Sequence, residues 1–435
     1  MDWNSIYQSR ITTAEEAVKS IKSGNRIFMT GNVSVPKTLL AALVAYAPNL
    51  KDVEICQALS IGPADYVKPG LEEHIRVNAL FISDNVRKAV QEGRADFTPV
   101  LLSEFPLLFK NNILPVDVAL IHVSPPDEHG FCSLGVEVGL TKSSAESSKI
   151  IIAEVNDQMP RTLGDSFMHV SRLMHIVPVS YPIVEMPMGG EGDKNTELIA
   201  GFLSDLIPDG ATMQMGIGGI PDAVLKYLFH KKDLGIHSEL ISDGVIDLVE
   251  AGVVTNARKT LHTGKIVIGF ILGSQRLYSW VDDNPMCEFH PTEYVNDPFV
   301  IAQNDRMVAI NSAIEVDLTG QVCADSIGPK FFSGIGGQFD FIYGASRSKG
   351  GVPIIAMPST NIAKDGTHTS KIVSMLKQGS GVVTGRNHVH YIVTEYGVAD
   401  LYGKSIRQRV RALINIANPD FRADLEKQAK ELNWI

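Results

Sequence analysis

The segment best suited to chemistry is a glycine-rich turn at residues 214–222, Gln-Met-Gly-Ile-Gly-Gly-Ile-Pro-Asp. It lies between a predicted strand and the N-terminus of a predicted helix. Glycines let a backbone approach a ligand closely, and the unpaired N–H groups of a first helical turn favour negative charge. No Lys or Arg occurs between Asp209 and Leu225, so the turn would hold an anion through backbone amides alone. A tight turn without a ligand is the alternative.

This turn is not a dinucleotide fingerprint, because Pro221 stands where the third glycine of G-x-G-x-x-G is required. A second Gly-Ile-Gly-Gly sequence occurs in the segment 333–338, Ser-Gly-Ile-Gly-Gly-Gln. The corresponding place in the first half of the chain has only Gly-Asn-Val-Ser at 31–34. We therefore expect the chemistry to lie in the second half.

A single acidic residue, Glu239, lies inside the otherwise apolar strand pattern of residues 234–244. In open α/β sheets, ligand-handling residues gather at the carboxyl ends of strands, where Glu239 is expected. A carboxylate in that place could act as a nucleophile or as a base. The alternative is a structural Glu paired with Lys or Arg from a neighbouring element.

Other motifs exclude common catalytic classes. The chain has neither G-x-S-x-G nor H-E-x-x-H, which argues against a serine hydrolase of the usual fold and against a zincin. His388 and His390 would share one face of a strand, but the pair has no acid beside it, so we expect no metal site.

Composition limits the class of protein further. The chain has 435 residues, 44% hydrophobic and 20% charged, which indicates a globular protein of two or three domains. Its net charge of -10 without a long basic run argues against a nucleic-acid partner. The four cysteines lie far apart and are expected to be reduced and mostly buried. We see no secretory signal and no apolar run of membrane-spanning length, so a cytoplasmic protein without membrane contact is expected.

Short apolar runs rich in Val and Ile recur along the chain, each followed by a helix-like stretch. They lie at 26–29, 116–123, 150–153, 266–271, 307–310 and 354–356. Apolar runs without alternation are typical of strands covered on both faces, as in parallel α/β sheets. The sequence therefore predicts open, mainly parallel α/β architecture.

The same order of features occurs twice, which indicates a tandem duplication. A strand, Gly31 and a helix opened by Pro36 match a strand, Gly216 and a helix opened by Pro221. Three later strands match as well: 118–123 with 307–310, 151–153 with 354–356, and 175–177 with 391–393. A Pro/Gly-rich stretch at 187–192 marks the expected boundary. We predict two similar α/β domains, residues 1–190 and 191–435, with Glu239 and both Gly-Ile-Gly-Gly loops in the second.

Three segments carry a resemblance to a known family: Gln-Met-Gly-Ile-Gly-Gly-Ile-Pro-Asp-Ala-Val at 214–224, His-Ser-Glu-Leu-Ile-Ser-Asp-Gly at 237–244, and Ser-Gly-Ile-Gly-Gly-Gln-Phe-Asp-Phe at 333–341. Together they resemble the acetyl-CoA hydrolase/transferase family, and within it the CoA-transferases that act on 4-hydroxybutyrate. The likeness covers nearly the whole chain. It implies two similar open α/β domains with the active site between them, in agreement with the duplication.

The resemblance implies that Glu239 is the nucleophile of a ping-pong reaction, which forms a mixed anhydride and then a glutamyl-CoA thioester. It implies that Gly337 and Asn296 donate hydrogen bonds to the oxyanions. The residues implied to bind CoA or substrate are Gly216, Ile217, Gly218, Gly219, Ile220, Ser333 and Gly337. Coenzyme A would be a substrate, and no metal or tightly bound cofactor is implied.

Several points stay open. The acyl group could be 4-hydroxybutyryl, butyryl or acetyl, with a carboxylate as acceptor. An acyl-CoA hydrolase is a close alternative, and a non-catalytic ligand sensor is a more distant one that would not need Glu239. The cations for the CoA phosphates could be Lys330, Arg347, Lys349 or Lys371, which are candidates by location only. A homodimer is kept open as the assembly.

Overall fold

The computed structural model describes residues 2–186, 193–216, 218–363 and 365–435. The chain divides into two compact units. Unit 1 comprises Met1–Pro187 and Val267–Val295, and unit 2 comprises Met188–Ile266 and Asn296–Ile435. The domain bounds expected from the sequence, 1–190 and 191–435, stay a prediction. The grouping of Val267–Val295 with unit 1 is a feature that the sequence analysis did not predict.

Unit 1 is built on a parallel sheet with the strand order β4-β3-β2-β1-β5-β7-β9. Its strands are β1 (Arg26–Met29), β2 (Val53–Ala58), β3 (Ile75–Phe81), β4 (Asp96–Phe97), β5 (Val118–Val123), β7 (Ile150–Asn156) and β9 (His175–Val179). Every residue of the central strand β5 is buried. Such a strand has no polar face, which is why its sequence shows no alternation.

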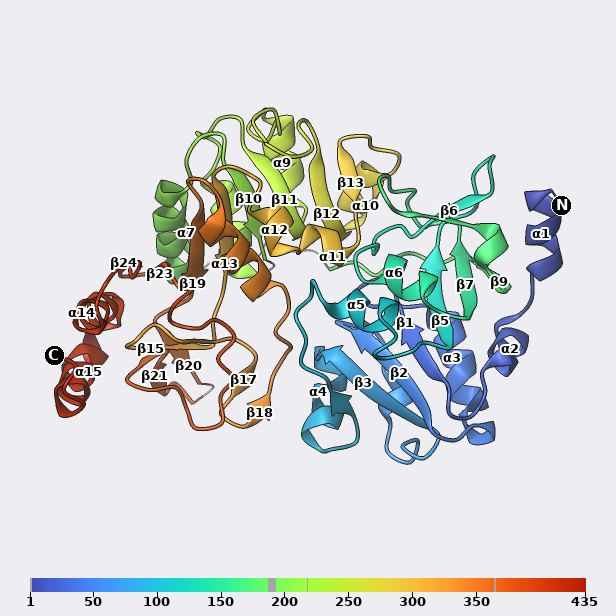
Figure 1. Ribbon diagram of the computed structural model, residues 1–435, viewed down its shortest axis with the longest axis horizontal. Helices are drawn as coiled ribbons and strands as arrows, with labels where there is room; N and C mark the ends of the chain where they lie inside the picture. The colour runs from blue at the N-terminus through green and yellow to red at the C-terminus, as the bar shows by residue number, and fades with distance from the viewer. Residues whose placement is uncertain (1, 187–192, 217, 364) are drawn as a thin grey trace. The chain divides into compact units, whose positions relative to one another are not determined.

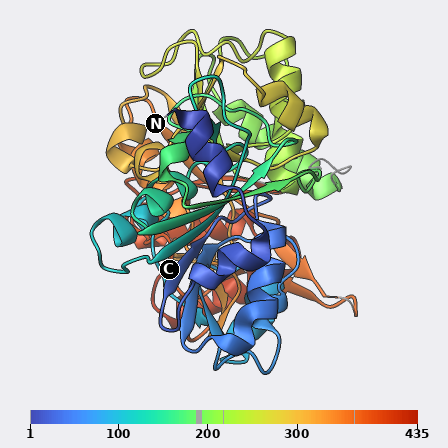
Figure 2. The same ribbon diagram turned by 90° about the vertical axis from the view of Figure 1, so that its right-hand side faces the viewer.

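Helices cover both faces of this sheet (Figures 1 and 2). One face packs in a single apolar core with α2 (Ala14–Ala17), α3 (Lys37–Tyr46) and α4 (Asp84–Gln91). On the other face, Phe28 of β1 contacts the rings of Phe105 and Phe109 from α5 (Phe105–Lys110). The remaining helices and strands of unit 1 are α1 (Trp3–Arg10), β6 (Phe131–Ser133), α6 (Thr141–Glu146), β8 (Phe167–His169), β12 (Ile266–Ile271, its first residue counted with unit 2), α10 (Gln275–Val281), β13 (Cys287–Phe289) and α11 (Thr292–Val295).

In unit 2 the main sheet runs β11-β10-β14-β19-β23-β24. Its strands are β10 (Thr212–Met215), β11 (Gly235–Ile241), β14 (Met307–Asn311), β19 (Val352–Ala356), β23 (Tyr391–Thr394) and β24 (Gly397–Asp400). All pairs are parallel except β23 with β24. Short ladders lie beside it: β15 (Glu315–Asp317), β16 (Val322–Cys323), β17 (Ser326–Ile327), β18 (Lys330–Phe331), β20 (Thr360–Ile362), β21 (His368–Ser370) and β22 (Ile372–Val373).

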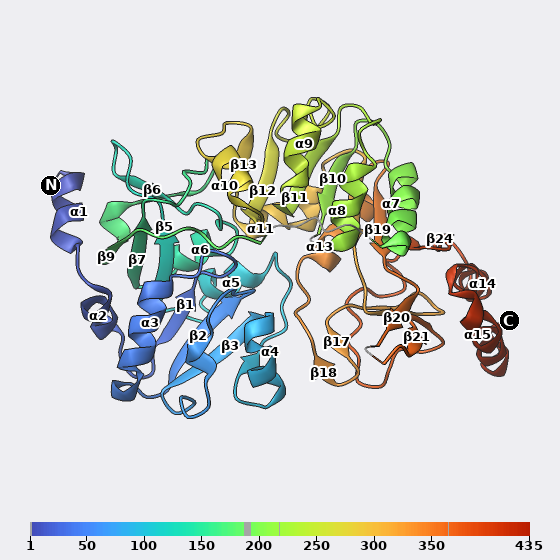
Figure 3. The ribbon, with the colours of Figure 1, turned by 180° about the vertical axis from the view of Figure 1, so that it is seen from behind.

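The helices of unit 2 also lie on both faces of its sheet. Figure 3 shows α7 (Lys194–Leu206), α8 (Gly219–Lys226) and α9 (Gly244–Glu250) on one face, and α13 (Gln338–Arg347) lies on the other. A second apolar core joins α14 (Ile406–Ile416) and α15 (Pro419–Glu431) to β15, β22 and β23. The short helix α12 (Pro298–Ile301) precedes β14.

The two sheets have equivalent strand orders, so the predicted duplication is visible in the topology. The strands matched in sequence occur in the orders β1-β5-β7-β9 and β10-β14-β19-β23. Pro36 and Pro221 both lie at the start of a helix, where the missing N–H needs no partner. The prediction of two open, mainly parallel α/β domains is confirmed.

Two further expectations concern the cysteines and membrane contact. Cys56, Cys132, Cys287 and Cys323 are all buried free thiols, as expected. Among the residues that the structure describes, no helix combines the length and the apolar composition needed to span a bilayer.

Candidate active site

Glu239 lies within β11, two residues before its end. Its neighbours Ser238 and Leu240 are buried, whereas the Glu239 side chain keeps partial exposure. Since successive side chains of a strand point to opposite faces, this carboxylate projects away from its two neighbours. The expected place near the carboxyl end of a strand is the place observed.

Among the described residues, the Glu239 carboxylate accepts one hydrogen bond, from the side chain of Asn296. Nδ2 of Asn296 donates to Oε2 of Glu239 over 3.1 Å. Asn296 is fully buried, and its Oδ1 has no partner in the part of the chain that the structure describes. Within the same residues, no Lys, Arg or His forms an ion pair with Glu239. A structural carboxylate held by a basic residue, the alternative left open above, therefore has no support.

Gly337 completes this cluster. It is buried, immediately precedes α13, and has φ of −92°, which any residue can adopt. A Cβ atom at this position would overlap with Oε2 of Glu239 and Nδ2 of Asn296. The carboxylate and the amide are therefore packed directly against bare backbone, and a glycine is needed for space rather than for conformation.

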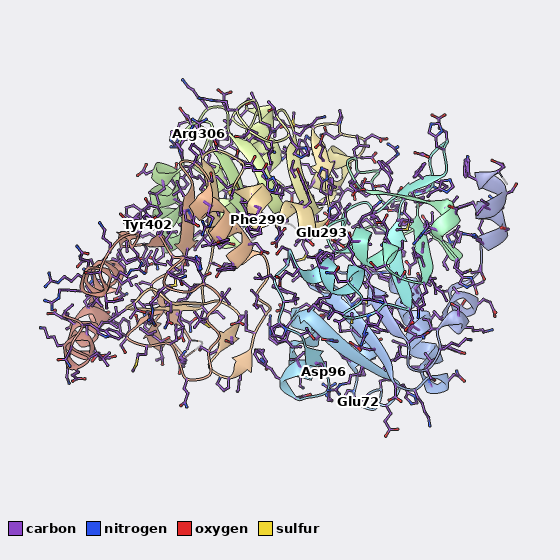
Figure 4. All side chains as sticks on the ribbon, in the orientation of Figure 1. Glu72, Asp96, Glu293, Phe299, Arg306 and Tyr402 are labelled. Atoms are coloured by element: carbon purple, nitrogen blue, oxygen red, sulfur yellow. The ribbon has the colours of Figure 1, made fainter. Side chains whose placement is uncertain are left out.

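Helix packing brings Asn296 and Gly337 to the same point. Asn296 precedes α12, whose N-terminus is capped by the Asp297 side chain accepting from the Phe299 N–H at 2.8 Å. Figure 4 labels Phe299 on this helix. Helix α13 packs closely on α12 at Gly344, where a Cβ would lie 2.5 Å from Cγ2 of Ile301. This close packing fixes the starts of both helices.

Burial dominates the electrostatics of Glu239. It raises the pKa of the carboxyl group to about 7, and the hydrogen bond from Asn296 opposes the rise. Near neutral pH the group is then present in both forms. A carboxylate with such a pKa is a stronger base than an exposed one, which suits a nucleophile or a general base.

The glycine turn leads from β10 into α8, as predicted. Gly218 has φ of 116° and ψ of −177°, a conformation that essentially requires glycine. Apart from chain neighbours and the backbone of its own helix, a Cβ at Gly216, Gly218 or Gly219 would meet no atom of the described residues within 4 Å. Protein packing therefore does not explain Gly216 and Gly219, and open space adjoins the turn. Ile220 lies in the first turn of α8, and Ile217 lies outside the described residues.

The family resemblance implies that this turn binds coenzyme A, so we expect Gly219→Ala to leave the fold intact and to weaken acyl-CoA binding. The new methyl group meets only open space in the protein, and alanine favours a helix more than glycine does by about 1 kcal/mol. The KM for acyl-CoA should rise at least tenfold while Tm stays the same or increases. An unchanged KM in the folded variant would remove the turn from the binding site.

Comparisons with known proteins decide the family. Models of the acetyl-CoA hydrolase/transferase N-terminal and C-terminal domains match residues 1–186 and 273–429. The chain is 52% identical over 431 residues to the 4-hydroxybutyrate coenzyme A transferase of Clostridium kluyveri, covering 99% of this chain and 100% of the relative. The chain belongs to the acetyl-CoA hydrolase/transferase family.

Two further members of this family give context. The succinyl-CoA:acetate/propanoyl-CoA:succinate CoA transferase of Fasciola hepatica is 47% identical and covers 96% of this chain, which spans 87% of the relative. The crystal structure of the 4-hydroxybutyrate CoA-transferase from Porphyromonas gingivalis is 40% identical with a TM-score of 0.85, covering 99% of this chain and all of that one. The predicted membership is confirmed.

Not every residue expected in a family site lies in the Glu239 cluster. Ser333 uses its hydroxyl group locally, donating to the carbonyl oxygens of Ala324 at 3.4 Å and Gly334 at 3.2 Å. Among the described residues, no hydrogen bond connects Ser333 to Glu239. The structure thus joins Glu239, Asn296 and Gly337 directly and leaves the role of Ser333 a prediction.

The four candidate cations differ in their surroundings. Lys330, Arg347 and Lys349 are exposed. Arg347 lies over the Tyr343 ring at 4.6 Å, and Lys349 pairs with Asp305 at 3.8 Å. Lys371 is half-buried, and burial lowers its pKa to about 8 against the opposing effect of Glu395. Their role toward CoA phosphates stays a prediction.

Sequence reasoning missed one polar pair at the carboxyl ends of β10 and β14. Oε1 of Gln214 accepts from Nδ2 of Asn311 and from the Ile310 N–H, both at 3.1 Å. The sequence pattern places Gln214 in the glycine turn and gives no reason to pair it with Asn311. Both are polar residues near the carboxyl ends of buried strands, Gln214 one residue before the end of β10 and Asn311 at the end of β14.

Proposed function

We propose that this member of the family is a CoA-transferase that moves CoA between a short-chain acyl-CoA and a carboxylate acceptor, with Glu239 as the nucleophile. The observation that carries the proposal is the carboxylate of Glu239, free of ion pairs among the described residues, bound by Asn296 and packed against Gly337. An attacking carboxylate needs an accessible oxygen and a position for the developing oxyanion beside hydrogen-bond donors.

The reaction begins with attack of a Glu239 oxygen on the thioester carbonyl carbon. The C–S bond breaks, CoA leaves as thiolate, and a mixed anhydride of Glu239 and the acyl group forms. The thiolate then attacks the Glu239 carbonyl carbon, which releases the first acid and leaves a glutamyl-CoA thioester. An acceptor carboxylate repeats both steps in reverse, and no net proton is consumed.

Two groups beside Glu239 are placed to stabilise the negative charge that develops on oxygen during the reaction. Each tetrahedral intermediate carries an oxyanion, and Nδ2 of Asn296 already donates a hydrogen bond at the position of one carboxylate oxygen. The Gly337 backbone packs against the same oxygen, since a Cβ at this position would overlap with it. Donors fixed before the reaction stabilise developing charge without reorganising, and removal of one such donor typically costs roughly 10²–10³ in kcat.

The names of the relatives guide the choice of acyl group. One is named for 4-hydroxybutyrate, and another for succinyl-CoA, propanoyl-CoA and acetate. The identity of 52% to the first favours 4-hydroxybutyryl-CoA with acetate as the substrate pair to test first. Butyryl-CoA and acetyl-CoA are the next substrates in the same series.

Steady-state kinetics separates transfer from hydrolysis. The purified chain is given 4-hydroxybutyryl-, butyryl- or acetyl-CoA, with and without acetate or another carboxylate, while acyl-CoA exchange and free CoA are both followed. Transfer requires that acceptor raise turnover at least a hundredfold and that free CoA stay low. Equal CoA release with and without acceptor would identify a hydrolase, and no turnover with any acyl-CoA would favour a binding protein.

The raised pKa of Glu239 predicts the pH dependence of the first half-reaction. Only the ionised carboxylate attacks, so kcat/KM for acyl-CoA should be maximal above pH 7 and fall about tenfold per pH unit well below it. The Asn296 hydrogen bond lowers this pKa, so Asn296→Ala should move the fall to higher pH as well as reduce the maximum. A pH profile of Asn296→Ala with an unshifted midpoint would show that Asn296 does not act on the nucleophile.

A further inference from the structure

A cavity of about 450 Å³ lies within unit 2, separate from the residues around Glu239 described above. It is bounded by the β15–β16 hairpin, the segment after β22 and the first residue of α14, elements that Figure 1 draws in orange and red. Its lining is Asp317, Thr319, Gln321, Met375, Leu376, Lys377, Ser380, Val382, Arg386, Ile406 and Trp434. The size falls within the roughly 300–1,000 Å³ of small-molecule sites.

The acidic side chains at this cavity already accept hydrogen bonds from protein donors. Oδ1 of Asp317 accepts from the Thr319 side chain at 2.7 Å, and Oδ2 accepts from Gln321 at 2.6 Å. Glu315, buried behind the wall, accepts from the Lys377 N–H at 2.9 Å and lies 3.5 Å from the Lys377 ammonium. The donors to Asp317 are uncharged, so this carboxylate keeps its negative charge, whereas the Glu315 carboxylate is paired with the Lys377 ammonium.

Arg386 lines the cavity, Arg409 lies behind its wall, and neither has an acidic partner among the residues that the structure describes. Nη1 of Arg409 donates to the carbonyl oxygens of Arg386 at 2.6 Å and Thr319 at 3.2 Å, and so fixes two parts of the cavity wall. Burial and the charge of Arg386 lower the pKa of Arg409. Among the described residues, neither arginine forms an ion pair. Arg386, Arg409 and Lys377 carry three positive charges against the two negative charges of Asp317 and Glu315, so the local charge is positive and favours an anion.

The other side of the cavity is apolar. Met375 is 60% exposed, Val382 47% and Ile406 37%, and the half-buried Trp434 indole lies with them. An exposed group of large apolar side chains beside unpaired cations suits a ligand with both an apolar, planar part and a strong negative charge. A guanidinium group binds phosphate oxygens through paired hydrogen bonds, which makes phosphate the preferred anion.

We propose that this cavity binds a nucleotide, with its phosphate at Arg386 and its base against Trp434 and the neighbouring apolar side chains. The nucleotide could be the phosphorylated adenosine end of coenzyme A or a free adenine nucleotide, since both offer the same chemistry. Only the first source rests on the proposed transferase function. The binding itself is independent of Glu239.

Direct binding tests the site. The full-length chain is titrated with adenosine 3′,5′-bisphosphate and with ADP by calorimetry and by tryptophan fluorescence. Trp434 is one of three tryptophans, so stacking should change the emission, and Trp434→Phe should remove that change. Arg386→Gln should weaken nucleotide binding at least tenfold and reduce the salt dependence of that binding. The backbone carbonyl of residue 386 can still accept the hydrogen bond from Arg409 in this variant. The matched control is Arg407→Gln, an exposed residue of α14 outside the cavity lining, which should stay within twofold of wild type.

Kinetics then distinguishes coenzyme A from a free adenine nucleotide as the ligand of this cavity. If the site takes the end of coenzyme A, Arg386→Gln raises the KM for acyl-CoA at least tenfold and leaves the KM for the corresponding acyl-pantetheine unchanged. If it takes a free nucleotide, both KM values stay unchanged while nucleotide binding is lost. Absence of saturable binding of both nucleotides, or binding that Arg386→Gln leaves unchanged, overturns the site. Neither result depends on whether Glu239 is the nucleophile.

Discussion

Glu239→Gln lowers the rate of CoA transfer by at least about 10⁴-fold, because removal of a covalent nucleophile costs far more than removal of one hydrogen bond. The glutamine keeps the shape of the side chain, and its oxygen can still accept from Asn296. It cannot form an anhydride, so neither half-reaction proceeds. Transfer between acyl-CoA and carboxylate, measured at pH 8 where wild-type Glu239 is mostly ionised, gives the comparison.

Glu197→Gln is the matched control for this change. Glu197 is exposed on α7 of the same unit and should tolerate the substitution with activity within twofold. Circular dichroism and the melting profile establish that both variants are folded. Residual activity of Glu239→Gln within tenfold of wild type would assign the nucleophile to another group.

Gly337→Ala should lower kcat by at least about 10²-fold, the scale associated with loss of one oxyanion donor. The added methyl group overlaps with both Glu239 and Asn296, so the carboxylate must turn away or the start of α13 must shift. The backbone angles of Gly337 suit alanine, so conformational strain does not contribute. Kinetics of transfer with saturating acyl-CoA and acceptor provides the measurement.

The control for Gly337→Ala is Gly201→Ala in the middle of α7. A Cβ at Gly201 meets no atom within 4 Å, so this variant should keep full activity and gain stability of about 1 kcal/mol from helix propensity. If Gly337→Ala also kept full activity with an unchanged fold, the close packing around Glu239 would have no catalytic role.

The architecture was largely predictable because its signals are local. Fully buried parallel strands such as β5 produce nearly continuous apolar runs, interrupted in β5 by the buried His122, and Pro36 and Pro221 mark helix starts. The repeated order of these signals predicted two sheets of equivalent topology. The segment 267–295 was not predicted to group with unit 1, because that grouping arises from tertiary contacts that no local pattern reports.

The site was predictable only in part. Glu239 stands out as an acid in an apolar strand, and the glycine turn is visible by composition. Asn296 and Gly337 lie 57 and 98 positions further along the chain, and only the family resemblance assigned them a role beside Glu239. Asn296 and Gly337 come into contact because α12 packs against α13 at Gly344. The same limitation explains why the Gln214–Asn311 pair was missed, since its two strands are neighbours only in the folded sheet.

The most direct test of the central claim is to locate the covalent intermediate. The enzyme is mixed with acyl-CoA without acceptor, reduced with borohydride, digested and analysed by peptide mass. A glutamyl-CoA thioester is reduced to an alcohol, whereas a resting carboxylate is not, so the change should occur at Glu239 in the peptide containing Leu234–Asp243. Removal of acyl-CoA and addition of acceptor carboxylate before reduction should abolish it. An unmodified Glu239 in fully active enzyme, or a label on another residue such as Glu250 or Glu315, would contradict the assignment.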